Sequence, residues 1–221
     1  MESNFWKKNL NAIFAATFVV FASTVGYMKI GLQPVIIVGG AGTIGFIFWY
    51  FTYLQSPVEP KVILPLFILT VTGLEIHMIE EYLTGFGPAM SRLFGIPWSE
   101  PGFIIVFMSI GPILYTLTTL GLFYKIPIAG FVAWFIFIGP GFAEFTHFIF
   151  PLIEPKLLPF DSTPLTQIIG GVLIKDMPNY YYKTLGHYYF SGLYTAVLPM
   201  IPGGYAIIRL VKYARELKQK D

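Results

Sequence analysis

The sequence has 221 residues, of which 55% are hydrophobic and 12% are charged; it carries a formal net charge of +2 and no cysteine. Soluble domains have about a quarter of their residues charged, so this composition excludes an ordinary soluble domain. The near-neutral charge offers no basic surface for nucleic acid, and the lack of cysteine excludes disulfides and thiolate metal ligands.

The apolar residues gather in six runs, each long enough to cross a bilayer as a helix. The predicted spans are residues 9–30, 34–54, 62–85, 103–124, 126–150 and 187–213. The first run is too long for the core of a signal peptide and is interpreted as a retained span. With no internal repeat and no second domain, the sequence predicts an all-α fold. We expect a polytopic membrane helix bundle of about six transmembrane helices, forming one domain over residues 1–221.

Three features within these elements predict local structure. The second span holds four glycines that favour close helix packing in lipid: Gly39, Gly40, Gly42 and Gly45. The Gly139-Pro140-Gly141 sequence is expected to kink the fifth span. Between the last two spans, the weakly apolar residues 165–174 are interpreted as a segment at the membrane interface.

The distribution of Lys and Arg predicts the orientation in the membrane. With six spans, both termini lie on the same side. That side collects Lys7, Lys8, Lys61, Lys125, Arg209, Lys212, Arg215, Lys218 and Lys220. The opposite side collects Lys29, Arg92, Lys156, Lys175 and Lys183. The bias predicts cytoplasmic termini, in a host membrane that the sequence leaves open.

Ionisable residues within the spans are few and concentrated. The third span carries His77, Glu80 and Glu81, which stand at i, i+3 and i+4 and so share one helix face. The fifth span carries Glu144 and His147 in a Glu-x-x-His pattern, which helical bundles use to present two metal ligands from one helix. Charged groups at membrane depth are costly, so these residues are functional candidates.

The predicted topology brings these residues to one depth. The third and fifth spans run outward with their ionisable groups near the end, and the sixth span runs inward with His187 at its start. We expect a cavity near the non-cytoplasmic face, with six metal-ligand candidates: His77, Glu80, Glu81, Glu144, His147 and His187. Imidazoles and carboxylates together suit one or two ions of zinc, iron or manganese. No organic cofactor is indicated.

Two further acidic residues are assigned supporting roles outside the ligand set. Glu75 points away from the face of His77 by helical geometry, and Asp176 precedes the sixth span on the same side as the cavity. A simpler interpretation also applies to each residue taken alone, because a buried His or Glu often does no more than hydrogen-bond a neighbouring helix.

The segment His77-Met78-Ile79-Glu80-Glu81 resembles the signature of the HXXEE-motif family of small multi-spanning membrane proteins. The resemblance implies a helical membrane protein in which His77, Glu80 and Glu81 are the functional residues. It does not imply a particular reaction.

A second resemblance is to the CAAX-type intramembrane glutamate proteases, which combine a Glu-Glu pair with two later histidines. Here the corresponding residues are Glu80, Glu81, His147 and His187. The sequence departs from that family because no arginine follows the glutamate pair at the expected spacing, and residues 142–147 are one residue too long for the family's Phe-His motif.

Three functions are compatible with these residues. The first is a metal-dependent membrane enzyme, with Glu81 as a ligand or general base, which hydrolyses or, with two irons, oxidises a lipid-soluble substrate. The second is a metal-free hydrolase in which Glu80 and Glu81 share a proton and activate water, and His147 and His187 stabilise an oxyanion. The third is a proton- or metal-coupled carrier. The predicted partners are the lipid bilayer and a lipid-soluble small molecule, and a chain of this size is compatible with oligomers or partner subunits.

Overall fold

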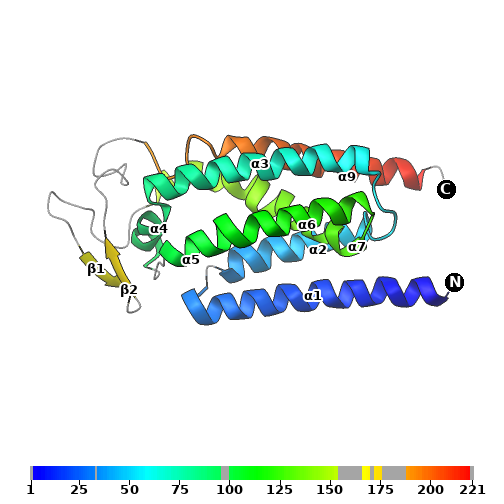
Figure 1. The fold of residues 1–221 in the computed structure, drawn as a ribbon, viewed down its shortest axis with the longest axis horizontal. Coiled ribbons are helices and arrows are strands. Elements are labelled where there is room, and N and C mark those ends of the chain that lie inside the picture. Colours follow the sequence, from blue (N-terminus) through cyan, green and yellow to red (C-terminus); the bar gives the residue numbers. More distant parts are fainter. Residues whose placement is uncertain are drawn as a thin grey trace. The chain divides into compact units, whose positions relative to one another are not determined.

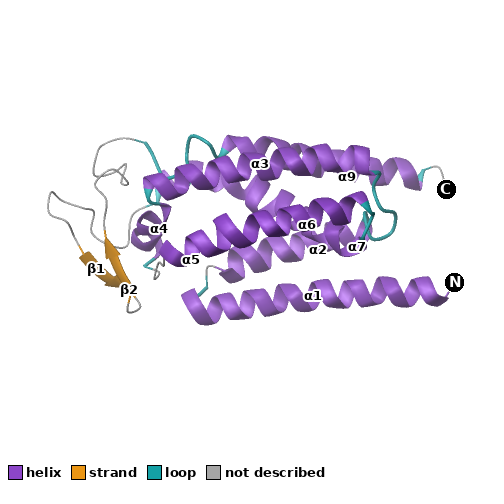
Figure 2. Ribbon diagram, in the orientation of Figure 1, coloured by secondary structure: helices purple, strands orange, loops and turns teal. Residues whose placement is uncertain are grey.

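The computed structural model describes residues 2–32, 34–95, 100–153, 166–169, 172–175 and 188–219. Almost all of these residues are helical, as Figure 2 shows. The elements in chain order are α1 (Glu2–Ile30), the π-helix η1 (Val35–Gly39), α2 (Gly40–Phe51), α3 (Pro60–Thr84), α4 (Phe86–Phe94), α5 (Glu100–Ile105), the π-helix η2 (Val106–Ile110), α6 (Gly111–Phe123), α7 (Pro127–Ile136), the π-helix η3 (Phe137–Gly141), the 3₁₀-helices η4 (Phe142–Phe148) and η5 (Phe150–Leu152), β1 (Thr166–Ile169), β2 (Val172–Lys175) and α9 (Val197–Lys218).

Four helical stretches are long and apolar enough to cross a membrane: Lys8–Lys29, Pro60–Thr84, Pro101–Phe123 and Pro127–Leu152. They coincide with the first, third, fourth and fifth predicted spans. A shorter apolar helix, Val35–Phe51, corresponds to the second predicted span. The prediction of an all-helical membrane protein is therefore confirmed.

One boundary differs from the prediction. The last helix begins at Val197 rather than at residue 187, because residues 188–196 form turns that contact the second half of α3. The strands β1 and β2, which overlap the segment predicted to lie at the interface, pair in antiparallel fashion, with Thr166 opposite Lys175 (Figure 1).

The chain divides into two compact units. The first contains Met1–Thr72, Ile113–Ala143 and Pro199–Asp221, and the second contains Gly73–Pro112 and Glu144–Leu198.

In the first unit, α2 and α7 pack against each other. The indole Nε1 of Trp49 donates a hydrogen bond to the Pro127 carbonyl at 2.8 Å, and Phe48 stacks on Trp134 with ring centroids 5.1 Å apart. A Cβ added at Gly45 would lie 3.1 Å from the backbone nitrogen of Phe135, so the two helices can approach this closely only with glycine at that position.

The other glycines of the second predicted span behave similarly, with one exception. Added Cβ atoms at Gly39 and Gly42 would lie 2.8 Å and 2.9 Å from side chains of α1, whereas one at Gly40 would meet no described residue within 4 Å. The packing interpretation is confirmed for three of the four glycines.

In the second unit, α4 packs its apolar face on the segment that precedes α9. Ala89, Met90 and Leu93 are buried together with Phe190. The helix ends at Gly95, whose φ of 66° is left-handed and whose N–H bonds to the Ser91 carbonyl at 2.8 Å. This small core anchors residues 188–196, which contribute to the site described next.

Candidate metal centre

Four ionisable side chains of the second unit converge on one point. His77 and Glu81 come from successive turns of α3, and Glu144 and His147 come from η4. One ligand atom from each residue lies within 4.8 Å of those of the other three. The group is a buried His/Glu cluster that can hold a metal ion.

The unusual helix geometry of residues 137–148 explains how Glu144 and His147 reach the same point. The predicted disruption at Gly139-Pro140-Gly141 takes the form of the π-helix η3, which is followed by the 3₁₀-helix η4. In a 3₁₀-helix with three residues per turn, side chains at i and i+3 are eclipsed. In an α-helix the same two side chains diverge by about 60°. The change of helix type therefore stacks Glu144 directly on His147.

The distances within the cluster fit a shared central ion. Nε2 of His77 lies 3.4 Å from Glu81 Oε1 and 3.2 Å from Glu144 Oε2. Nε2 of His147 lies 3.2 Å and 2.9 Å from the same two oxygens. Ligands at the corners of a tetrahedron around zinc, with bonds of about 2.0–2.1 Å, are about 3.3 Å apart.

The His77 ring supports the same interpretation. Its Nε2 atom makes no hydrogen bond of acceptable angle with any described residue, although Glu144 Oε2 lies at 3.2 Å. The nitrogen is therefore buried without a hydrogen-bond partner among the described residues, as expected of an atom that is available to bind an ion.

The other nitrogen of each imidazole has a partner that fixes its tautomer. Nδ1 of His147 lies 2.8 Å from the Ser191 carbonyl, which only accepts, so this nitrogen carries a proton. Nδ1 of His77 lies 3.1 Å from the hydroxyl of Thr195, and that hydroxyl donates its own proton to Glu80 at 2.5 Å. In the neutral form of each ring the lone pair is then on Nε2, which faces the centre and is the atom that a metal ion would bind.

The cluster is enclosed on most sides. The side chains of His77, Glu81 and His147 are at most 3% exposed, whereas Glu144 is 14% exposed and marks the more accessible side. Aromatic rings surround His147: Phe86, Phe150 and Phe190. The negative charge of two carboxylates with so little exposure to solvent must be neutralised, either by a bound cation or by protonation of the two imidazoles.

The structure places two of the remaining predicted residues, Glu80 and Glu75, outside this cluster. Glu80 turns to the segment before α9, where it accepts hydrogen bonds from Thr195 N at 2.8 Å and from the hydroxyl of Tyr189 at 3.2 Å. Glu75 has a buried Oε1 with no hydrogen-bond partner among the described residues. The candidate ligand His187 and the supporting residue Asp176 lie outside the described residues.

Sequence reasoning missed the contribution of residues 191–195. The Ser191 carbonyl and the Thr195 hydroxyl orient the two imidazoles, and Gly192 packs its backbone against the cluster. The segment was assigned to a continuous helix, in which these backbone groups are not available. The Ser-Gly sequence at its start is the signal that could have indicated a turn.

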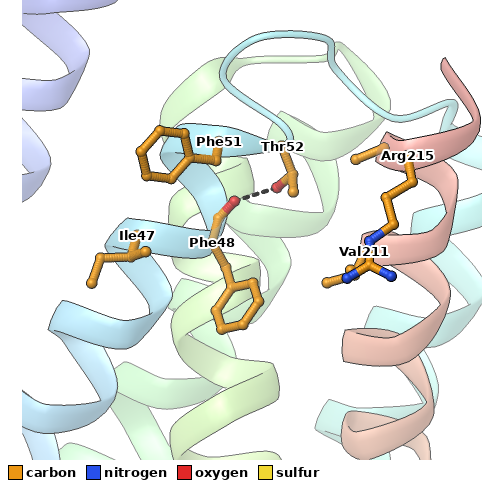
Figure 3. Close-up of a pocket in the computed structure, with 7 residues that line it drawn as sticks. Ile47, Phe48, Phe51, Thr52, Val211 and Arg215 are labelled. Carbon is orange, nitrogen blue, oxygen red and sulfur yellow. Dashed lines mark hydrogen bonds between the residues drawn. The ribbon is translucent and has the colours of Figure 1, made fainter. Parts of the chain in front are cut away.

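A separate hollow in the first unit lacks this chemistry. It has a volume of about 230 Å³ and is lined by α2 and α9 (Figure 3). Its lining includes Ile47, Phe48, Phe51, Thr52, Val211 and Arg215. The Thr52 hydroxyl is already bonded to the Phe48 carbonyl. With no histidine or carboxylate in its lining, this hollow offers no metal ligand.

Comparison of the chain with protein-family models, with curated proteins and with solved structures found no match. The function is therefore inferred from the residues of the chain itself.

Proposed function

We propose that the chain is a membrane metalloenzyme that binds one divalent ion through His77, Glu81, Glu144 and His147 and hydrolyses a lipid-soluble substrate. The observation that carries the proposal is the convergence of two Nε2 lone pairs and two carboxylates at separations typical of ligands around one metal.

The donor set narrows the choice of ion. Calcium takes six to eight oxygen ligands and magnesium keeps several waters, so a site with two imidazoles suits neither. Zinc, iron and manganese accept nitrogen together with oxygen. Among the described residues, four ligands surround one point, whereas di-iron bundles use six side chains. One ion therefore fits better than two, and zinc, which prefers four ligands of this kind, fits the set best.

The difference in exposure between the two carboxylates suggests their roles. Catalytic zinc sites hold the ion with three protein ligands and leave a fourth position for water. His77, Glu81 and His147 are the more deeply buried three, and Glu144 faces the accessible side. We assign the first three as permanent ligands. A bound ion would lower the pKa of a water molecule, and the Glu144 carboxylate would be placed to act as the general base that accepts a proton from it.

The metal-free alternative finds less support in the geometry. It requires Glu80 and Glu81 to share a proton, but Glu80 Oε2 accepts from the backbone and hydroxyl of Thr195, while Glu81 Oε1 faces the two imidazoles. The motif that resembles the HXXEE family then supplies two metal ligands, His77 and Glu81, with Glu80 in a different role.

We also propose that both termini are cytoplasmic and that the site lies in the non-cytoplasmic leaflet.

The proposal is tested by the metal content of detergent-purified protein prepared without chelators. Elemental mass spectrometry is expected to find about one equivalent of zinc, iron or manganese in the wild type. The metal should be lost in Glu81→Gln and in His147→Ala, and retained in Glu59→Gln, a matched change at an exposed carboxylate. No metal in the wild type would overturn the proposal, and two equivalents would replace it with a di-metal site.

Hydrolysis is tested separately on mixed micelles that contain long-chain nitrophenyl esters. Activity should disappear on chelation and return with the metal found in the purified protein. Glu144→Gln should retain most of the metal but lose activity, because the amide cannot accept the proton. Full activity in Glu144→Gln would exclude the role assigned to this carboxylate.

A further inference from the structure

Glu80 is the anchor of a hydrogen-bond network that ends at a ligand of the proposed metal. Its Oε2 atom accepts from the backbone N–H of Thr195 at 2.8 Å and from the Thr195 hydroxyl at 2.5 Å. Its Oε1 atom accepts from the hydroxyl of Tyr189 at 3.2 Å and from the N–H of Tyr194 at 3.4 Å. Four donors occupy a carboxylate that lies one residue from a proposed ligand, so Glu80 is not free to bind the ion.

The Thr195 hydroxyl connects this carboxylate to His77. A hydroxyl has one proton to donate and lone pairs to accept with. Because the proton of Thr195 goes to Glu80, the group can only accept from Nδ1 of His77, 3.1 Å away. The sequence of bonds therefore places a proton on Nδ1 of His77, so that in the neutral ring the lone pair is on Nε2.

The two histidines differ in how firmly the partner of Nδ1 fixes the tautomer of the ring. His147 bonds to a backbone carbonyl, which can only accept and cannot reverse its direction. His77 bonds to a hydroxyl, which can rotate and donate instead. A donating hydroxyl would move the proton of a neutral His77 to Nε2, which then could not ligate a metal.

We propose that Glu80 and Thr195 are positioning residues that hold His77 in its metal-ligating tautomer, an inference that rests on the metal centre proposed above. Glu80 fixes the orientation of the Thr195 hydroxyl by accepting its proton. The hydroxyl can then only accept a hydrogen bond from Nδ1–H of His77. The two adjacent glutamates therefore have different roles: Glu81 binds the ion, and Glu80 orients His77, which binds the same ion.

The test compares Thr195→Val, which removes only the hydroxyl, with Thr195→Ser, which keeps it. The matched control is Thr70→Val, since Thr70 is a buried threonine of α3 whose hydroxyl bonds to its own helix at Leu66. The metal affinity of each purified variant is measured by competition with a chromogenic chelator. Cobalt is then substituted, and its visible absorption reports the ligand geometry.

We expect Thr195→Val to bind the metal about 10- to 100-fold more weakly, the range typical of lost outer-shell partners, and to alter the cobalt spectrum. Thr195→Ser and Thr70→Val should retain the wild-type affinity and spectrum. Glu80→Gln should also weaken metal binding, because the glutamine amide can donate to the Thr195 hydroxyl and leave that hydroxyl free to donate to His77. It provides the decisive measurement if Thr195→Val does not fold.

Two failures are distinguishable. Wild-type protein that binds metal, together with unchanged affinity and spectrum in both Thr195→Val and Glu80→Gln, overturns the positioning role and leaves the metal centre standing. Wild-type protein that binds no metal overturns both. Equal loss in Thr195→Val and Thr195→Ser assigns Thr195 to packing and also refutes the inference.

Discussion

Gly192 offers the sharpest test of the packing around the cluster. Its φ of +86° is left-handed, and a Cβ added there would lie 2.7 Å from Cε1 of His77. The same atom would lie 2.9 Å from Cγ of Glu81 and 2.9 Å from Cε1 of His147. Real Cβ atoms essentially never make contacts under 3.0 Å. We therefore predict that Gly192→Ala drives a methyl group into the ligands.

The magnitude follows from two separate costs. An alanine in the left-handed region costs about 1–2 kcal/mol. Overpacking a tight site costs typically about 1–3 kcal/mol more, so we expect Gly192→Ala to lose about 2–5 kcal/mol of stability. To reach an ordinary contact of about 3.4 Å, the His77 ring must retreat by about 0.7 Å. Metal–ligand bonds tolerate about 0.2 Å, so metal binding should fail as well.

Gly95→Ala is the matched control because Gly95 also has a left-handed φ, of +66°, but its added Cβ meets no atom of the described residues within 4 Å. Thermal unfolding in detergent and elemental mass spectrometry are measured for both variants. Gly95→Ala should lose only the backbone cost, about 1–2 kcal/mol, and keep its metal. If Gly192→Ala unfolds at the same temperature as Gly95→Ala and binds as much metal, the backbone of residue 192 does not pack on the cluster as described.

Two further predictions concern the first unit. Gly130→Ala should destabilise the protein by about 1–3 kcal/mol, since the added Cβ would overlap the ring of Tyr53. The control is Gly40→Ala, a helical position where the added Cβ meets no described residue, which should be neutral or stabilising by up to about 1 kcal/mol. Similar melting temperatures for the two variants would refute the contact between Gly130 and Tyr53. The Lys125 ammonium, which donates to Glu59 at 2.7 Å, lowers the pKa of the Glu59 carboxyl, so the contribution of this pair exists above the ordinary glutamate pKa and is lost as the pH falls through the lowered value. The difference in melting temperature between wild type and Glu59→Gln should therefore shrink between about pH 6 and about pH 3, and a constant difference would contradict this sign.

The sequence was sufficient for the class of fold because the bilayer imposes a strong pattern. Long apolar runs predict spanning helices directly. The boundaries of the last helix were wrong, since hydropathy does not distinguish a buried turn from a buried helix. Residues 188–196 are as apolar as a helix, yet their backbone departs from helical geometry to bond Glu80 and His147.

The candidate ligands were predicted in part for a similar reason. The spacing of His77 and Glu81 fixes a shared face on an α-helix, and the structure confirms that they converge. The same reasoning also predicted Glu80 as a ligand, because side chains at i+3 and i+4 both lie near position i. The partners of each carboxylate separate the two: Glu80 bonds to Thr195, over a hundred residues later, whereas Glu81 faces His77 and His147. Nor does the sequence predict that η4 is a 3₁₀-helix, which makes Glu144 and His147 coincide.

The four ligands come from two stretches of chain, α3 and η4, that lie about 60 residues apart, and the sequence contains no cysteine. An ion that ties these stretches together acts as a removable cross-link. In the chain-entropy description of cross-links, closing a loop of about 60 residues restricts the unfolded chain by on the order of 4 kcal/mol. Removal of the ion by a chelator would then release this constraint along with any catalysis. The same four side chains would thus couple the stability of the fold to the supply of the ion.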